Sequence, residues 1–194
     1  MKTVIAAKLD ESSRVIKAVS AQADAIALMG EALVACYKRG NKILTFGNGG
    51  SACDAQNFAD ELVGRYERNR PGLPALALTT NTGDLTSIGN DFGFEWVFER
   101  PLRAFAKPGD IAVAISTSGN SPNVLKAAAA AKELGLTVLG FSGETGGKLK
   151  PFCDHILCVP SKSVARIQEA HITVIQILCG IIESTLFPDA PKAH

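Results

Sequence analysis

Beyond Gly40 the chain alternates between short apolar runs and longer stretches with helical spacing, and this alternation limits the possible folds most strongly. Each apolar run ends in small polar residues before the next helical stretch, which is the pattern of repeated β-loop-α units. The runs are rich in Ile, Leu, Val and Ala, as expected of strands that helices cover on both faces. We predict an α/β fold with a parallel sheet, whose strands are residues 42–46, 75–78, 111–115, 137–141 and 155–159.

The stretches between these runs predict helices at residues 52–66, 85–88, 121–134 and 165–186. Apolar residues also recur at helical spacing from Leu9 to about Arg39, which predicts a helical N-terminal third. A length of 194 residues fits one domain, residues 1–194, with residues 1–40 as a helical extension used in oligomerisation.

The last predicted helix is apolar around much of its circumference between Ile167 and Ile182. A helix of this kind is buried on more than one side. We infer that it packs against a neighbouring subunit. The alternative is a central helix inside one domain.

Charge and cysteine content exclude several functions. The chain has 20 basic and 19 acidic residues, so it has no overall positive electrostatic potential that would attract nucleic acid. Arg65, Arg68 and Arg70 form a short basic cluster, which we interpret as a solvated helix end, with a local phosphate contact as the alternative. No run approaches the apolar length of a membrane span, and the apolar stretch among the first residues is too short for a secretory signal. The five cysteines are widely spaced and odd in number, which indicates reduced thiols. We expect a cytoplasmic protein that binds neither nucleic acid nor a membrane.

Two polar loops follow predicted strands, at the edge of an open parallel sheet where ligands bind. The first is Gly47–Ser51 (GNGGS) and the second is Ser116–Ser121 (STSGNS). Neither is a Walker A motif or a dinucleotide fingerprint. Simple helix capping needs one serine, whereas four hydroxyls beside a helix N-terminus suit a phosphate dianion. We therefore predict a phosphorylated sugar as ligand. Its phosphate is expected on Ser116, Thr117, Ser118 and Ser121, and its sugar near Asn48, Gly49, Gly50 and Ser51.

Four segments carry a resemblance to a known family: GNGGSACDAQNFADEL, TSIGNDFGF, AISTSGNSPNVLKA and RIQEAHITVIQ. In this order and at these separations they resemble the sedoheptulose 7-phosphate isomerases of the sugar isomerase (SIS) domain family, over almost the whole chain. The resemblance implies a five-stranded parallel sheet between helices and a homotetramer with active sites built from more than one subunit. It also implies conversion of sedoheptulose 7-phosphate to D-glycero-D-manno-heptose 7-phosphate, the first step toward the heptose of bacterial surface polysaccharides. It adds Asn90, Asp91 and Gln168 to the expected substrate-binding residues.

Aldose-ketose isomerisation requires a base for a carbon-bound proton and a group that polarises the carbonyl oxygen. By resemblance, Glu61 takes the position of the family's catalytic glutamate and metal ligand, and Gln176 that of a catalytic histidine. The implied metal site comprises Asn57, Glu61, Gln168 and Gln176, with Asn57 and Gln176 in place of two histidines. Amide oxygens are weak zinc ligands, so we expect no cofactor, or weakly held zinc.

His171 is not the missing histidine moved along the helix. A five-residue offset from Gln176 turns it by about 140° around the helix axis. We interpret His171 as a structural residue.

Two functions therefore stay open. In one, Glu61 alone shuttles the proton while amides polarise the substrate without a metal. In the other, the site binds a sugar phosphate without turnover, as in SIS tetramers that associate with the bacterial replication initiator or in a regulator that senses a sugar phosphate. The initiator-binding relatives lack the glutamate at the position of Glu61. Its presence here, with Asp54 and the GNDFGF segment, favours an enzyme.

Overall fold

A five-stranded parallel sheet forms the centre of the computed structural model, which describes residues 1–192. The order of strands is β2-β1-β3-β4-β5, and every neighbouring pair is parallel. The strands are β1 (Ile43–Gly47), β2 (Ala75–Ala77), β3 (Ile111–Ser116), β4 (Thr137–Gly143) and β5 (His155–Val159). The predicted α/β fold and all five predicted strands are confirmed.

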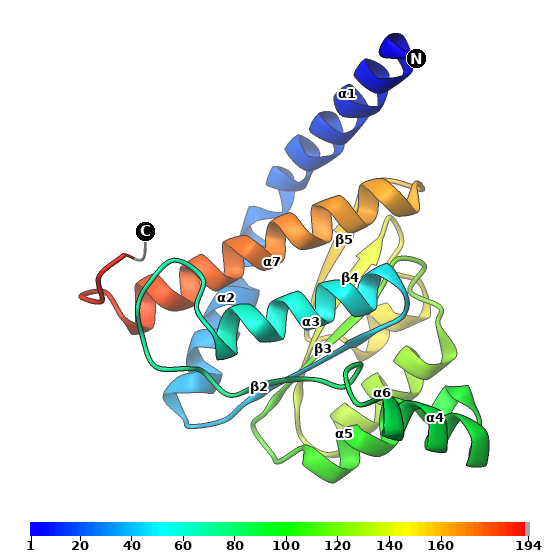
Figure 1. Ribbon diagram of the computed structural model, residues 1–194, viewed down its shortest axis with the longest axis vertical. Coiled ribbons are helices and arrows are strands. Elements are labelled where there is room, and N and C mark those ends of the chain that lie inside the picture. Colours follow the sequence, from blue (N-terminus) through cyan, green and yellow to red (C-terminus); the bar gives the residue numbers. More distant parts are fainter. Residues whose placement is uncertain (193–194) are drawn as a thin grey trace.

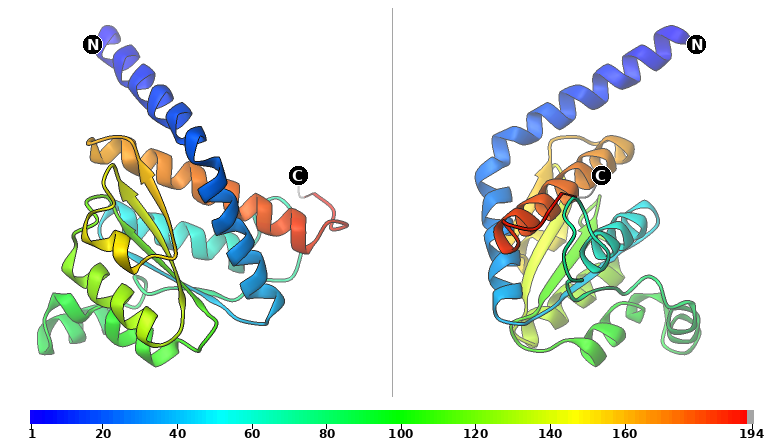
Figure 2. Two further views of the ribbon diagram at one scale, coloured as in Figure 1. Left: turned by 180° about the vertical axis from the view of Figure 1, so that it is seen from behind. Right: turned by 60° about the vertical axis from the view of Figure 1, so that its left-hand side comes forward.

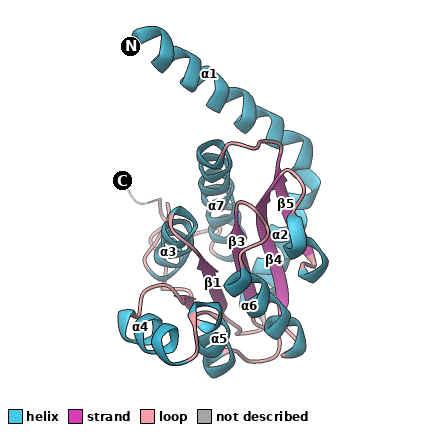
Figure 3. Cartoon of the chain, turned by 90° about the vertical axis from the view of Figure 1, so that its right-hand side faces the viewer, coloured by secondary structure: helices cyan, strands magenta, loops and turns pink. Residues whose placement is uncertain are grey.

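Helices cover both faces of this sheet, which Figure 3 shows at the centre of the molecule. The α-helices are α1 (Lys2–Val19), α2 (Ala23–Lys38), α3 (Gly50–Val63), α4 (Thr82–Asp91), α5 (Glu99–Phe105), α6 (Pro122–Glu133) and α7 (Val164–Leu186). Residues of α2, α3 and α7 share one apolar core, and residues of α5 and α6 share the other. Figure 1 shows α3 and α7 running side by side.

The alternating direction of side chains along a strand explains the two cores. In β3, Ile111, Val113 and Ile115 contribute to the core under α3 and α7. Ala112 and Ala114, between them, contribute to the core under α5 and α6. All of β3 is buried, which is why its sequence is a continuous apolar run.

The N-terminal third differs from the prediction of one helical stretch starting at Leu9. A short 3₁₀ segment, Ser20–Gln22, separates α1 from α2, and α1 starts at Lys2. Figures 1 and 2 show α1 extending away from the rest of the molecule. Its residues Val4, Ile5 and Leu9 are all exposed. This helix therefore presents apolar side chains that its own chain does not cover.

Two expectations about the chain need correction. By length and composition, the stretch 2–38 and helix α7 are both apolar enough to cross a membrane, so the expectation that no run approaches this length is wrong. This is weak support for a membrane span, because the core helix of a soluble protein passes the same test, and α7 packs against the sheet and α3. The solvated interpretation of Arg70 is also wrong, since its side chain is fully buried.

Candidate functional site

The strand order places the two polar loops next to each other. The chain leaves β1 toward β2 on one side and later returns through β3 on the other, so the topological switch point lies between β1 and β3. Gly47 is the register partner of Ile115, so residues 47–51 and 116–121 both start at this point of the sheet edge. As predicted, the two loops lie at one end of the parallel sheet.

A pair of side-chain amides joins these loops. Asn48 Nδ2 donates to Asn123 Oδ1, and Asn123 Nδ2 donates to Asn48 Oδ1, each over 2.8 Å. Asn123 is 2% exposed, and its Oδ1 also accepts from the backbone N of Val124 at 2.9 Å. Asn123 thus fixes Asn48 relative to the first turn of α6. Sequence reasoning missed Asn123, although its place in the first turn after the serine-rich loop was a usable signal.

The second loop leads into α6, which starts at Pro122 with Ser121 as its N-cap residue. The Ser121 side chain makes no capping bond and instead lies 3.0 Å from Ser116, hydroxyl to hydroxyl. Ser118 Oγ accepts from the backbone N of Asn120. The Ser116 and Ser121 hydroxyls therefore meet at the helix N-terminus without capping it, an arrangement that suits an anion.

The turn after β4 holds this loop from outside. Leu149 N donates to Gly119 O at 2.9 Å, and Lys148 N donates to Asn120 Oδ1 at 3.2 Å. A Cβ atom on Gly119 would lie 2.1 Å from Gly146 O, so glycine permits this close contact. The loop is consequently positioned before any ligand binds.

Two hollows flank the loop. One of about 330 Å³ is lined by Thr117, Ser118, Gly143, Glu144, Thr145, Ser161, Lys162, Val164 and Ile167. The other, of about 470 Å³, is lined by Asn48, Phe92, Gly93, Phe94, Glu95, Ser121, Pro122 and Asn123. Asn90 and Asp91 line neither hollow. Both are exposed, and their side chains bond to each other at 2.8 Å, so their role in substrate binding stays a prediction.

Helices α3 and α7 bring the expected catalytic residues together. Gln176 Nε2 donates to Asn57 Oδ1 at 3.0 Å and to Glu61 Oε1 at 3.2 Å. Gln168, eight residues earlier on α7, packs against the start of α3, where a Cβ on Gly50 would lie 2.1 Å from its Nε2. The amide of Gln168 therefore lies next to the first loop, whereas Glu61 lies about three turns further along α3.

The hydrogen-bond chemistry of this group does not fit zinc. An ionised carboxylate only accepts, so the Gln176 atom that faces Glu61 is its NH₂ group. Its two hydrogens serve Glu61 and Asn57, so Gln176 directs hydrogens rather than lone pairs at the two oxygens. Residues 1–192 contain no group of three or more His, Cys, Asp or Glu side chains that could hold a metal ion. One carboxylate among amides is a poor zinc site.

Two buried ionisable groups lie near these elements. Asp54 precedes Asn57 by one helical turn, and among the described residues its Oδ2 has no hydrogen-bond partner. Burial raises the pKa of Asp54 to about 6. His171 lies against Phe141 with its Nε2 at 3.1 Å from Ser142 O, and burial lowers its pKa to about 4. His171 is therefore neutral and packed in the core, which supports the structural role predicted for it.

Comparisons with known proteins agree with this fold. Residues 9–143 match the SIS domain family. The chain is 49% identical over 188 residues to the phosphoheptose isomerase of Trichlorobacter lovleyi, covering 96% of each protein. It is also 49% identical over 185 residues to phosphoheptose isomerase 1 of Campylobacter jejuni, covering 95% of this chain and all of the relative. The structure of phosphoheptose isomerase from Neisseria gonorrhoeae superposes with a TM-score of 0.90 at 42% identity, covering 94% of this chain and 98% of that one.

Proposed function

The chain belongs to the phosphoheptose isomerases of the SIS domain family, and from this premise we propose that it converts sedoheptulose 7-phosphate to D-glycero-D-manno-heptose 7-phosphate. The observation that carries the proposal is the contact between Glu61 and Gln176 on two helices that also border the polar loops. A carboxylate held beside a sugar phosphate site is a sufficient base for aldose-ketose isomerisation.

In this proposal Glu61 is the only proton-transfer group that acts on carbon. It removes a proton from C1 of the ketose, which gives an enediol, and returns the proton to C2 to form the aldose. The hydroxyl on O1 loses its proton, and O2 gains one. One Glu61 oxygen accepts from Gln176, and the other is assigned to the carbon-bound proton. The amide NH₂ of Asn57, whose oxygen accepts from Gln176, is assigned to the carbonyl oxygen, where it stabilises the negative charge that develops.

The two loops bind the parts of the substrate that lie away from the reacting carbons. Ser116, Thr117, Ser118 and Ser121 are assigned to the phosphate, because the Ser116 and Ser121 hydroxyls meet at the N-terminus of α6 and the other two residues lie in the loop between them. The loop that follows β1 is assigned to the sugar, with Asn48 oriented by Asn123. Binding energy at the phosphate then orients C1 and C2 toward Glu61.

Assembly, compartment and cofactor complete the proposal. We assign the protein to the cytoplasm as a homotetramer whose active sites lie between subunits, with neither nucleic acid nor membrane as a partner. The exposed apolar residues of α1 support assembly, as does an apolar groove of about 320 Å³ between α1, α2 and α7. We assign no metal cofactor, because one carboxylate among amides is a poor set of zinc ligands.

The test replaces Glu61 with glutamine, which keeps the size of the side chain and removes the base. Turnover of sedoheptulose 7-phosphate, and exchange of its C1 proton with deuterated solvent, should fall by roughly 10² to 10⁴ fold with little change in affinity. Asp60→Asn is the matched control, since Asp60 is the exposed neighbour of Glu61. Chelator treatment of the parent protein should leave turnover unchanged.

Three outcomes would contradict parts of this proposal. An active Glu61→Gln variant would remove Glu61 from its role. Loss of activity with a chelator, restored by zinc, would overturn the metal-free assignment. A parent protein that binds the sugar phosphate but neither turns it over nor exchanges its proton would be a binding protein of this fold rather than an isomerase.

A further inference from the structure

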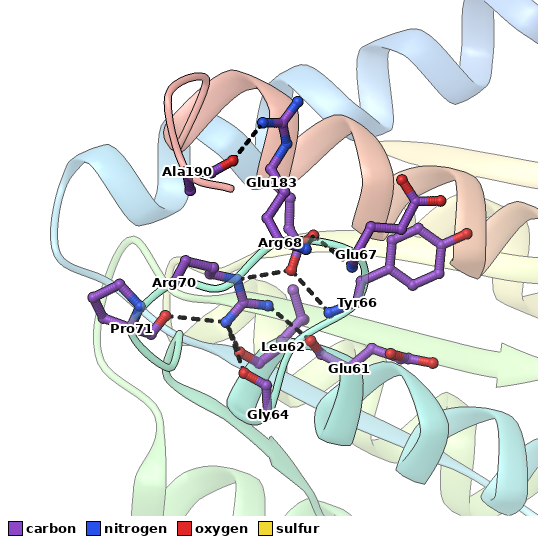
Figure 4. A network of polar contacts seen from close by, with 10 residues as sticks. All are labelled: Glu61, Leu62, Gly64, Tyr66, Glu67, Arg68, Arg70, Pro71, Glu183 and Ala190. Carbon is purple, nitrogen blue, oxygen red and sulfur yellow. Dashed lines mark hydrogen bonds and ion pairs between the residues drawn. The ribbon is translucent and has the colours of Figure 1, made fainter. Parts of the chain in front are cut away.

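A buried ion pair joins the two helices that carry Glu61 and Gln176 (Figure 4). Glu183 lies on α7 seven residues after Gln176, which places both on the same face of the helix two turns apart. Its side chain is 1% exposed, and Arg70 Nε donates to its Oε1 at 2.9 Å. Its carboxylate also accepts three backbone amides at 2.8 Å each, from Tyr66, Glu67 and Arg68.

Arg70 uses its other nitrogens on the end of α3. Its Nη2 donates to the backbone oxygen of Glu61 at 2.8 Å, and its Nη1 donates to the oxygens of Leu62 at 2.7 Å and Gly64 at 3.2 Å. The last carbonyls of a helix have no donor within the helix and carry its negative dipole end. A guanidinium satisfies both needs at once, and here it does so on the residue whose side chain is the proposed base.

Glu61 is thus tied to α7 through both its main chain and its side chain. Its side chain meets Gln176 directly, and its main-chain oxygen is held through Arg70 to Glu183. We propose that Arg70 and Glu183 are positioning residues of the isomerase, an inference that rests on the proposed function. They fix the last turn of α3 against α7, so that the Glu61 carboxylate stays in contact with the Gln176 amide.

The chemistry of the pair favours positioning over plain stabilisation. A buried ion pair is often no more stabilising than apolar side chains of similar volume. An apolar pair would fill this space, but it would leave the carbonyl of Glu61 and three amides without partners. A fixed, planar set of donors is what a guanidinium offers and an ammonium does not.

The test uses Arg70→Lys and Glu183→Gln, with Asp110→Asn as the matched control. Asp110 is also 1% exposed and accepts from a lysine side chain and from the backbone amides of Lys42 and Lys107. It lies before β3, at the edge of the sheet opposite the loops. All three variants should be less stable. Assayed where each is folded, Arg70→Lys and Glu183→Gln should lose about tenfold or more in kcat with KM changed less than about threefold, and Asp110→Asn should keep kcat within about twofold.

A second readout does not depend on turnover. The side-chain amide signal of Gln176 in ¹⁵N NMR spectra, assigned with Gln176→Ala, reports its contact with Glu61 and Asn57. This signal should shift in the Arg70 and Glu183 variants and stay in place in Asp110→Asn. If the parent protein is inactive but the variants shift the Gln176 signal as expected, the isomerase proposal is contradicted. The inference that Arg70 and Glu183 position the contact between Glu61 and Gln176 still holds in that case.

The double variant Arg70→Met with Glu183→Leu covers the case in which the single variants do not fold. It removes the unpaired buried charge that Glu183→Gln leaves, so it should be more stable than that variant although the four backbone groups stay unpaired, and kcat and the parental Gln176 signal should still be lost. Parental kcat in any folded variant of the pair, or an equal loss of kcat in Asp110→Asn, would overturn the inference.

Discussion

Asp54 is a carboxylic acid in an environment that favours its neutral form. It is 9% exposed, and its pKa is raised from 3.8 to about 6 because burial disfavours the charge. The folded state therefore binds this proton more tightly than the unfolded state does. Ionisation of the buried Asp54 side chain destabilises the folded state. This destabilisation is absent below pH 4, grows as the pH rises to 6, and is constant above that.

Replacing Asp54 with asparagine should therefore stabilise the protein at pH 8 and have little effect near pH 4. After allowance for partial access of solvent, we expect a gain of about 1 to 2 kcal/mol above pH 6. Thermal unfolding measured from pH 4 to pH 8 checks this, with Asp60→Asn as the exposed control. A gain that is the same at both ends of this range would show that charge is not its cause.

At the scale of residues, the sequence allowed part of the site to be predicted. Asn57 and Glu61 are one helical turn apart, and Gln168 and Gln176 are eight residues apart, so each pair shares a helix face and the resemblance supplied the link between the faces. Asn123 and Arg70 were missed because their partners lie 75 and 113 residues away in the chain. No local pattern indicates that an arginine beside other basic residues is buried.

The loop that follows β3 and the turn that follows β4 act as one structural unit. Gly147 has a φ of +55°, and a Cβ there would lie 2.6 Å from Ser118 O and 2.7 Å from Gly119 O. Any side chain at this position must therefore displace the residues assigned to the phosphate. The close packing of the loop against this turn positions the hydroxyls as much as the start of α6 does.

Gly147→Ala should weaken sugar phosphate binding by about tenfold, because one or two charge-assisted hydrogen bonds are misplaced. Gly40→Ala is the matched control, since Gly40 has a similar φ of +77° with no atom within 4 Å of an added Cβ. Both variants should lose about 1 to 2 kcal/mol of stability from the left-handed backbone, but only Gly147→Ala should bind less tightly by calorimetry. Equal sugar phosphate affinities of the two variants would show that the turn does not position the phosphate site.

The elements themselves differ in how well the sequence predicted them. Strands β1 and β3 were predictable because they are buried along their whole length, which makes each one a largely apolar run. Helix α5 was missed, because seven residues that include Pro101 are too short to show a period. Helix α3 starts at Gly50, two residues before the predicted start, and Gln168 packs against this glycine, which has no side chain.

At the scale of the whole molecule, α1 and α7 expose apolar surface that a single chain does not cover. The groove between α1, α2 and α7 is lined almost entirely by apolar side chains, among them Ile16, Val174 and Ile177. Ile177 is 48% exposed in the middle of α7. A second copy of the chain, which offers the same apolar groups, is the occupant that we assign to this groove.

Light scattering of the parent protein should report a tetramer at micromolar concentration. Ile177→Asp should dissociate it, because a carboxylate in an apolar interface must be desolvated, whereas Ile177→Val should not. A monomeric parent protein, or an intact tetramer in Ile177→Asp, would place the subunit contacts elsewhere.

The distance along the chain between Arg70 and Glu183 has a consequence for synthesis. The two residues are 113 positions apart, so at about 5 to 20 residues per second the ribosome makes Glu183 roughly 6 to 23 s after Arg70. During this interval the arginine has no carboxylate to accompany it into the interior, and the end of α3 cannot be completed. In the nascent chain, Glu61 is therefore synthesised well before the contacts that position it can form. The chain becomes able to catalyse the reaction only when α7 docks.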